Sequence, residues 1–174
     1  QAVSRGLGDV YKRQLLHARP GHGQRVRSAV MDDVAACTNV IHRIAEAMDA
    51  ADYLSLRLLL EHADLVDGAS GTVLASGGEA AAAHFQSIVK VHDDGTWRTK
   101  HVTTNPIVEF DGDTATIRSM YTVFQQTDAI PIQPIIAGRY HDTFARIDGT
   151  WWITERRYFA DLVGDLSDHL TFEL

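Results

Sequence analysis

Two hairpin-turn signals, each between two long segments of alternating apolar and polar residues, dominate the second half of the chain. Both contain Asp-Gly, at Asp111-Gly112-Asp113 and at Asp148-Gly149. Asp-Gly between alternating segments is a strong indicator of a tight antiparallel hairpin. Long strands in turn predict a sheet that is strongly twisted and bent. The four predicted strands are residues 97–110, 114–126, 135–147 and 150–159.

The first half of the chain carries helical patterns instead. Over residues 34–48 the apolar residues recur in alternating steps of three and four, which places them on one face of an α-helix. Asp32 or Asp33 is a suitable cap for the start of this helix. A second helix is expected over residues 53–62, with Asp52 as its cap.

Two short strands and a third helix complete the first half. Residues 65–67 and 72–75 have the composition of short strands, and Ser76 and Glu79 have the spacing of a capping box before a helix that runs to about residue 89. Helices followed by long antiparallel strands indicate the α+β class. We expect a cone-shaped α+β barrel, with three N-terminal helices packed on a strongly bent, mainly antiparallel sheet that encloses a mostly apolar pocket.

Size, charge and cysteine content limit the classes of function. A chain of 174 residues suits one domain with a real core. Its net charge of −7 repels phosphate backbones, so nucleic acid is not an expected partner. No apolar run is long enough to cross a membrane. Cys37 is the single cysteine and lies on the apolar face of the first helix; we expect it in the core of a cytoplasmic protein.

The first thirty residues differ from the rest in composition. They hold six basic residues and one acid, and they show neither helical nor strand periodicity. Residues 9–14 can be encoded by the transposase end sequence used to prepare sequencing libraries. We therefore expect residues 1–30 to be a non-native or disordered leader, made of translated adapter and read-through. Met31 is then the natural start of a domain over residues 31–174, and a chain that begins there is expected to fold as well as the full one.

Polar residues that interrupt the apolar patterns are the candidates for chemistry. Asp49 ends the first helix and shares a line with His42 beside the apolar stripe; this carboxylate either points into the interior or is an ordinary solvated group. On the first long strand, His101, Thr103 and Asn105 share one face. That face either lines a polar part of a pocket or holds a core histidine. Histidine is the usual general acid or base near neutral pH.

The next two strands offer further polar groups. Tyr121 and Gln125 share a face, and Tyr121 either donates to a substrate oxygen or is a packing residue. On the third long strand, Tyr140 and Asp142 point to one side and Arg139 and His141 to the other; one of these pairs must face inward. A structural salt bridge from Arg156 or Arg157 to Asp142 is expected across the last hairpin.

Motifs for metals and nucleotides are missing from the sequence. It contains no HExxH, CxxC or histidine pair at metal-ligand spacing. It also contains no GxxxxGK[ST] and no GxGxxG after a strand. We expect neither a metal nor an organic cofactor.

Four segments together resemble a known family: residues 44–53 (IAEAMDAADY), 99–115 (TKHVTTNPIVEFDGDTA), 138–142 (GRYHD) and 147–153 (IDGTWWI). On these segments the chain is similar to the SnoaL-like branch of the nuclear transport factor 2-like superfamily, which includes scytalone dehydratase and ketosteroid isomerase. The resemblance implies the cone-shaped α+β fold, a dimer formed through the outer sheet face, and a small hydrophobic organic ligand.

The same resemblance implies roles for individual residues. Asp49 and His101 match the aspartate and histidine of scytalone dehydratase, whereas Met48 stands where that family has tyrosine and Gln125 falls near its second histidine. Asp49 and His101 are thus the candidate catalytic pair. His101 would move a proton, Asp49 would orient and stabilise its ring, and Tyr121 or Tyr140 would bind the developing oxyanion. The candidate substrate-binding residues are Tyr121, Gln125, Tyr140, Asn105, His42 and Met48.

The expected function is that of a small-molecule pocket protein. The resemblance favours a cofactor-independent lyase or isomerase of the dehydratase type, acting on a cyclic, polyketide- or steroid-like hydrophobic substrate. The alternatives are a non-catalytic ligand-binding protein and the small subunit of an oxygenase-type complex. The superfamily hosts all three, so the fold does not choose between them.

Overall fold

The computed structural model describes residues 22–172 of the chain. The chain divides into two compact units, Gln1–Val34 and Ala35–Leu174. The predicted adapter-derived part of the leader lies outside the described residues, and the described part of the first unit is the beginning of helix α2 (His22–Asp49). All elements that follow belong to the second unit.

Helix α2 begins well before the predicted start near Val34. Asp32 and Asp33 lie inside the helix, so neither caps it. The residues before Val34 show no apolar stripe because their described side chains face solvent, as with Val30 and Met31. A polar helical segment has no periodicity to detect, yet it continues a helix when no proline interrupts it.

The two shorter helices differ in how far their predicted caps hold. In α3 (Tyr53–Leu59), Asp52 is the N-cap and its carboxylate accepts from the backbone N–H of Ser55 at 3.0 Å, as predicted. In α4 (Gly78–Ile88) the capping box was a wrong prediction, because the N-cap is Gly77 and no side chain caps the helix. Ser76 instead ends a strand, and its hydroxyl donates to Asp64 at 2.5 Å.

The strands form one six-stranded sheet in the order β2-β1-β6-β5-β4-β3. All neighbours are antiparallel except β1 and β6, which are parallel. Both Asp-Gly turns join paired strands, as predicted. The sheet does not close, because β2 and β3 are its two edges; the architecture is the expected α+β cone without a closed barrel. The strands are β1 (Asp64–Asp67), β2 (Val73–Ser76), β3 (Thr99–Asp111), β4 (Thr114–Gln125), β5 (Gln133–Ile147) and β6 (Thr150–Val163).

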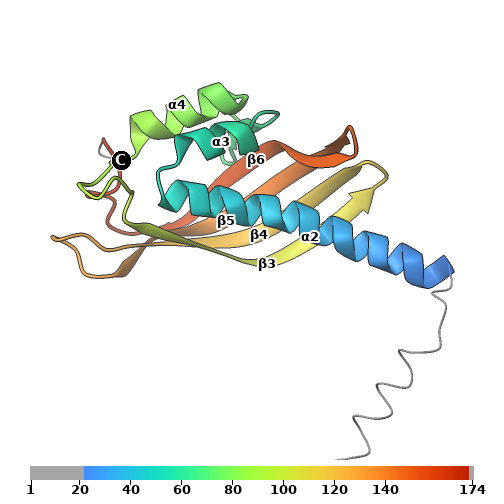
Figure 1. Ribbon diagram of the computed structural model, residues 1–174. Helices are drawn as coiled ribbons and strands as arrows, with labels where there is room; N and C mark the ends of the chain where they lie inside the picture. Colours follow the sequence, from blue (N-terminus) through green and yellow to red (C-terminus); the bar gives the residue numbers. More distant parts are fainter. Residues whose placement is uncertain (1–21, 173–174) are drawn as a thin grey trace, which may run out of the picture. The chain divides into compact units, whose positions relative to one another are not determined.

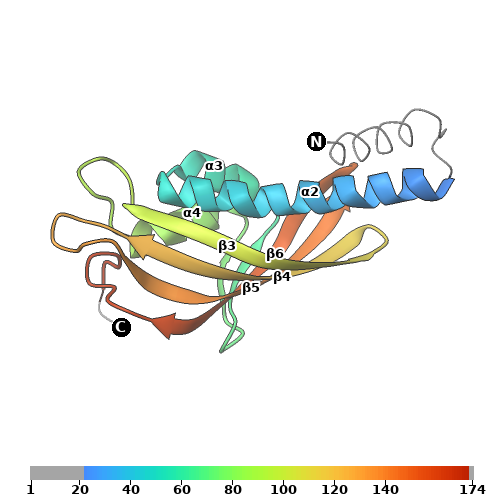
Figure 2. The same ribbon diagram turned by 90° about the horizontal axis from the view of Figure 1, so that it is seen from below.

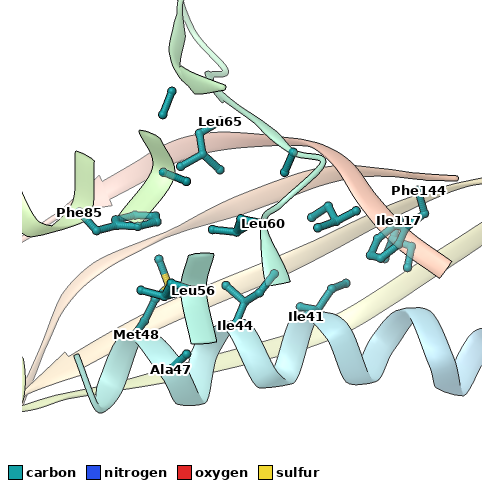
Figure 3. Close-up of a cluster of buried hydrophobic side chains, with 14 of the residues drawn as sticks. Ile41, Ile44, Ala47, Met48, Leu56, Leu60, Leu65, Phe85, Ile117 and Phe144 are labelled. Carbon is teal, nitrogen blue, oxygen red and sulfur yellow. The ribbon is translucent and has the colours of Figure 1, made fainter. Parts of the chain in front are cut away.

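In the second unit, α3, α4 and the adjoining part of α2 lie on the same side of the bent sheet (Figure 1). Their apolar faces and the inner face of the sheet form the main core. Figure 3 shows Ile41, Ile44 and Met48 of α2 pointing toward Leu56, Leu60 and the strands. Cys37 is fully buried in this core, as predicted. The packed core fixes α2 against the sheet and so sets the position of its last residue, Asp49.

Burial decides which pair of the third long strand faces inward. Tyr140 and Asp142 are buried, so they lie on the inner face. Asp142 accepts two hydrogen bonds of 2.8 Å from Arg156, which lies directly opposite on β6. The predicted salt bridge is therefore present and uses Arg156, whereas Arg157 pairs with Glu155.

Candidate functional site

Asp49 is held by donors from one short stretch of β3. The hydroxyl of Thr99 donates to its Oδ1 at 2.9 Å, and the backbone N–H of His101 lies 3.1 Å from both carboxylate oxygens. Asp49 is the last residue of α2, where the partial negative charge of the helix end makes a carboxylate unfavourable. The local helix does not account for an acid at this position, whereas the donors of β3 do.

The imidazole of His101 completes the arrangement. Its Nδ1 lies 2.7 Å from Oδ1 of Asp49, and the two side chains are 6% and 11% exposed, respectively. Lys100 adds a weaker contact: its Nζ lies 3.8 Å from Oδ2 of Asp49, and the lysine side chain is mostly in solvent. The structure thus brings together the two residues that the sequence named as a catalytic pair, from elements that are far apart in the chain.

The strand that carries His101 starts from a strained backbone. Arg98 has a φ of +52°, which is unusual for a residue with a side chain. It forms ion pairs with Asp94 at 3.1 Å and Asp128 at 2.8 Å. These two contacts hold the turn that leads from Trp97 into β3 and aligns Thr99 and His101 with Asp49.

The charge balance of the pair favours an ionised carboxylate. Burial by itself raises the pKa of Asp49, but the hydrogen bond and charge of His101 and the hydroxyl of Thr99 lower this pKa on balance below its ordinary value. An ionised Asp49 can only accept a hydrogen bond, so Nδ1 of His101 is the donor and carries the hydrogen of the neutral ring. Nε2 then keeps a lone pair, and among the described residues it has no hydrogen-bond partner. An imidazole oriented in this way can act as a general base.

Two hollows reach the pair, and both contain Asp49 in their walls. One, of about 320 Å³, lies between α2 and β3. The other, of about 400 Å³, includes Thr99, Gln125 and the connection from β4 to β5. Both are open grooves beside the packed core, which differs from the enclosed, mostly apolar pocket that the sequence predicted. Side chains of α2, α3 and the strands fill the space between these elements (Figure 3).

The remaining candidates on α2 and β4 lie around these grooves or behind them. His42 is exposed and lines the smaller groove together with Asp49 and His101. Met48 is 5% exposed and belongs to the core cluster, so its side chain lies behind the pair. Gln125 is buried and lines the larger groove.

Tyr121 and Tyr140 lie on the inner face of the sheet, where Tyr121 is directly opposite Thr103 of β3. Their rings stack with centroids 4.2 Å apart. Burial, followed by the charge of Asp161, raises the pKa of Tyr121 to about 12, so its hydroxyl stays protonated. It donates to the carbonyl of Phe159 at 3.3 Å. The Tyr121 hydroxyl therefore already donates to a carbonyl, and it would have to give up this bond to donate to a substrate oxyanion.

Asn105 does not join the other candidates. Its φ is +54° and it lies at an irregularity of the β3–β4 pairing between Thr104 and Ile107. Its side chain is exposed, with Nδ2 3.6 Å from the sulfur of Met120. The alternation that placed Asn105 beside His101 assumes a regular strand, and the irregularity breaks it.

His169 was missed by the sequence reasoning. It lies after the last strand, in a segment without periodicity, and yet it is only 8% exposed. Its ring centroid is 6.4 Å from that of Trp97, and the ring of His101 is 6.4 Å from Trp97 as well. No local signal marks this histidine, because its burial depends on the fold of the whole unit.

The described part of the chain contains neither a candidate metal site nor a candidate membrane-spanning helix. Within residues 22–172 there is no group of three or more histidine, cysteine or acidic side chains arranged to hold a metal ion. In the same part of the chain, every helix is too short or too polar to span a bilayer.

A comparison with protein families gives a match over residues 29–157, to the SnoaL-like domain. The chain belongs to the SnoaL-like family. The match begins inside α2, before Met31, and covers Asp49, His101 and the residues that hydrogen-bond to them. No match was found among curated proteins.

Solved structures share the fold of this SnoaL-like protein at low sequence identity. An NTF2-like protein with a cystatin-like fold from Novosphingobium aromaticivorans is 22% identical, with a TM-score of 0.64 over 80% of this chain and 90% of that one. A protein provisionally described as a scytalone dehydratase, from the same organism, is 18% identical, with a TM-score of 0.59 over 79% and 95%. The beta subunit of a provisionally described aromatic-ring-hydroxylating dioxygenase, also from that organism, is 15% identical, with a TM-score of 0.61 over 78% and 93%.

Proposed function

We propose that this SnoaL-like protein is a cofactor-independent lyase or isomerase that moves a proton on a cyclic, polyketide- or steroid-like hydrophobic compound. The observation that carries the proposal is the 2.7 Å contact between Asp49 Oδ1 and His101 Nδ1. A carboxylate that holds one ring nitrogen orients the other toward a substrate and stabilises the imidazolium that forms. The fold shared with a protein described as a scytalone dehydratase agrees with this chemistry.

The proposed reaction follows from the two ring nitrogens of His101. Nε2 takes a proton from a carbon beside a carbonyl, and the C–H electron pair becomes a new C=C bond. In an elimination, the C–O bond on the next carbon breaks, and the departing hydroxide takes the proton back from His101 to leave as water. In an isomerisation, the proton returns to a different carbon. Asp49 stays ionised throughout and stabilises the charged ring, and neither route needs a cofactor.

The test is product analysis after incubation with cyclic β-hydroxyketones and unsaturated cyclic ketones. His101→Ala is expected to reduce turnover by at least about a hundredfold, the usual contribution of a positioned general base. His141→Ala is the matched control, because His141 lies on the outer face of the sheet against Phe159. Unchanged turnover in His101→Ala would show that the pair does not perform the reaction.

A second candidate function is that of a small subunit without its own activity. The observation that favours it is the fold shared with the beta subunit of a dioxygenase. The open grooves beside the pair agree with a binding role as well. Absence of any His101-dependent product, together with co-purification of an oxygenase subunit, would support this alternative.

The proposal includes a homodimer in the cytoplasm. Exposed apolar side chains on the edge strand β3 and on its neighbour β4, namely Val102, Ile107 and Met120, would form part of an interface on the outer sheet face. The single buried cysteine, Cys37, is compatible with a reducing compartment.

A further inference from the structure

Among the buried polar atoms that lack a hydrogen-bond partner in the described residues, two belong to side chains that contact Trp97. They are Oε1 of Gln125 and Nδ1 of His169. Gln125 is 1% exposed, so its carbonyl oxygen has exchanged water for an interior without a donor. Leaving such groups unpaired is costly, and native proteins rarely do so unless a ligand or water completes the bond.

The orientation of the Gln125 amide is set by its surroundings. Its Nε2 donates to the carbonyl of Trp97 at 3.2 Å and to the carbonyl of Asp168 at 3.2 Å. Turning the amide over would place Oε1 against two carbonyl oxygens, which is repulsive. Oε1 is therefore a fixed acceptor, and only a group that carries a hydrogen to donate can satisfy it.

His169 belongs to the segment that follows β6, residues 165–171, and this segment is held by hydrogen bonds from other parts of the chain. Besides accepting from Gln125, Asp168 receives the hydroxyl of Thr127 on its carboxylate at 2.5 Å. The backbone N–H of Lys90 donates to the carbonyl of His169 at 2.8 Å. In Figure 2 this segment, the β4–β5 connection and the α4–β3 connection gather at one end of the sheet. Contacts from three parts of the chain thus fix the backbone at Asp168 and His169.

Trp97 connects these residues to the candidate catalytic pair. Its ring lies 6.4 Å from His101 and 6.4 Å from His169. Burial, and then the nearby charges of His101 and His92, lower the pKa of His169 to about 4, so its ring is neutral near pH 7. Gln125 also lines the same groove as Asp49. The Gln125 amide bonds the carbonyl of Asp168, the residue before His169, so the two unsatisfied atoms belong to neighbouring parts of the structure, one of which lines the groove that contains Asp49.

We propose that Gln125 and His169 form a subsite for a hydroxyl group of the ligand, so that the protein binds cyclic alcohols in preference to the ketones of the same skeleton. The reason is donor count. A hydroxyl can donate its one hydrogen to Oε1 of Gln125 and accept from Nδ1–H of the neutral His169 ring, whereas a ketone oxygen only accepts and leaves Oε1 unpaired. The inference rests on the proposed function, and it selects elimination of water over isomerisation.

The test measures binding, so it is independent of turnover. Dissociation constants for β-tetralol, β-tetralone and tetralin, and for cyclohexanol and cyclohexanone, are obtained on the full chain from tryptophan fluorescence. The alcohol of each pair is expected to bind roughly tenfold more tightly than the ketone, as for one buried hydrogen bond. The preference is expected to persist in His101→Ala, so a failure of the proposed chemistry leaves this result unaffected.

Matched variants separate a specific role from a structural one. Gln125→Met and His169→Phe are expected to bring the alcohol and ketone constants within about twofold of each other, by loss of the alcohol alone. His92→Phe is the control, because His92 bonds the carbonyl of Asp168 at 3.2 Å but holds no unpaired buried atom. It should shift both constants equally. Equal binding of alcohol and ketone by the unaltered protein, or binding of neither alcohol, overturns the subsite.

Discussion

At the scale of single residues, burial separates two ion pairs that otherwise have the same form. Arg156 pairs with Asp142, and Arg139 pairs with Asp161; each guanidinium makes two hydrogen bonds across β5 and β6. The side chains of the first pair are 1% and 0% exposed, and those of the second 44% and 41%. A buried charge that loses its partner cannot recover water, whereas an exposed charge can.

Removing one partner should therefore have very different costs in the two pairs. Arg156→Met is expected to lower the free energy of unfolding by about 3–5 kcal/mol, because Asp142 stays buried and unpaired. Arg139→Met should cost under about 1 kcal/mol. The double variant Asp142→Leu, Arg156→Met should regain most of the loss. Urea denaturation of the four proteins measures this; equal costs for the two arginine variants would contradict the argument.

The same scale shows what the sequence could and could not predict of the candidate site. Resemblance and spacing named Asp49 and His101 as candidates, and the last hairpin predicted a salt bridge to Asp142 without choosing between Arg156 and Arg157. An irregularity of the β5–β6 pairing between Thr143 and Phe144, which no local signal marks, brings Arg156 opposite Asp142. Asn105 was misplaced because period-two alternation fails at a backbone irregularity. His169 had no signal at all, because its burial arises from contacts between segments that are distant in sequence.

At the scale of elements, packing decides where helices begin and end. The predicted strands agree with the structure because their turns are local signals. The predicted start of α2 and the predicted cap of α4 were wrong, because neither feature depends on local sequence alone. Gly78 is an example. A side chain at this position would place its Cβ 1.8 Å from the backbone carbonyl oxygen of Arg57 in α3. Glycine lets the two helices approach.

Two effects compete in Gly78→Ala, and the clash should win. Helix propensity alone would stabilise α4 by up to about 1 kcal/mol. The contact with the backbone of Arg57 forces α3 and α4 apart and should instead destabilise the protein by about 2 kcal/mol or more. Ala80→Gly, at an exposed position of the same helix, is the control and should cost about 1 kcal/mol through propensity only. Thermal unfolding compares them, and a more stable Gly78→Ala protein would refute the packing argument.

At the scale of the whole molecule, the segment after β6 packs back onto the second unit and contacts both a helix end and the sheet. Leu170 pairs with Val89 at the end of α4, and Leu166 packs on the cluster around Tyr121 and Tyr140. His169 is buried between these contacts in its neutral form. Titration of this one ring is therefore linked to the stability of the entire unit.

The free energy of unfolding should fall as the pH drops from about 6.5 toward 4, because His169 is protonated in the unfolded chain but stays neutral when it is buried in the folded one. The pKa of His169 is lowered from 6.5 to about 4, by burial first and then by the charges of His101 and His92. Below about pH 6.5 this histidine binds a proton in the unfolded chain but not in the folded one. The free energy of unfolding is therefore highest above pH 6.5 and falls progressively below it. The loss is at most about 3 kcal/mol.

Urea denaturation at a series of pH values measures this loss. His169→Gln is expected to be less stable at pH 7 yet to lose less stability than the unaltered protein on acidification. Asp67→Asn is the matched control, because the backbone N–H groups of Ser70 and Ala69 lower the pKa of this carboxyl below its ordinary value, so it titrates beneath this range and should leave the slope above about pH 5 unchanged. If His169→Gln keeps the full acid slope, the ring of His169 does not govern the acid stability of the unit.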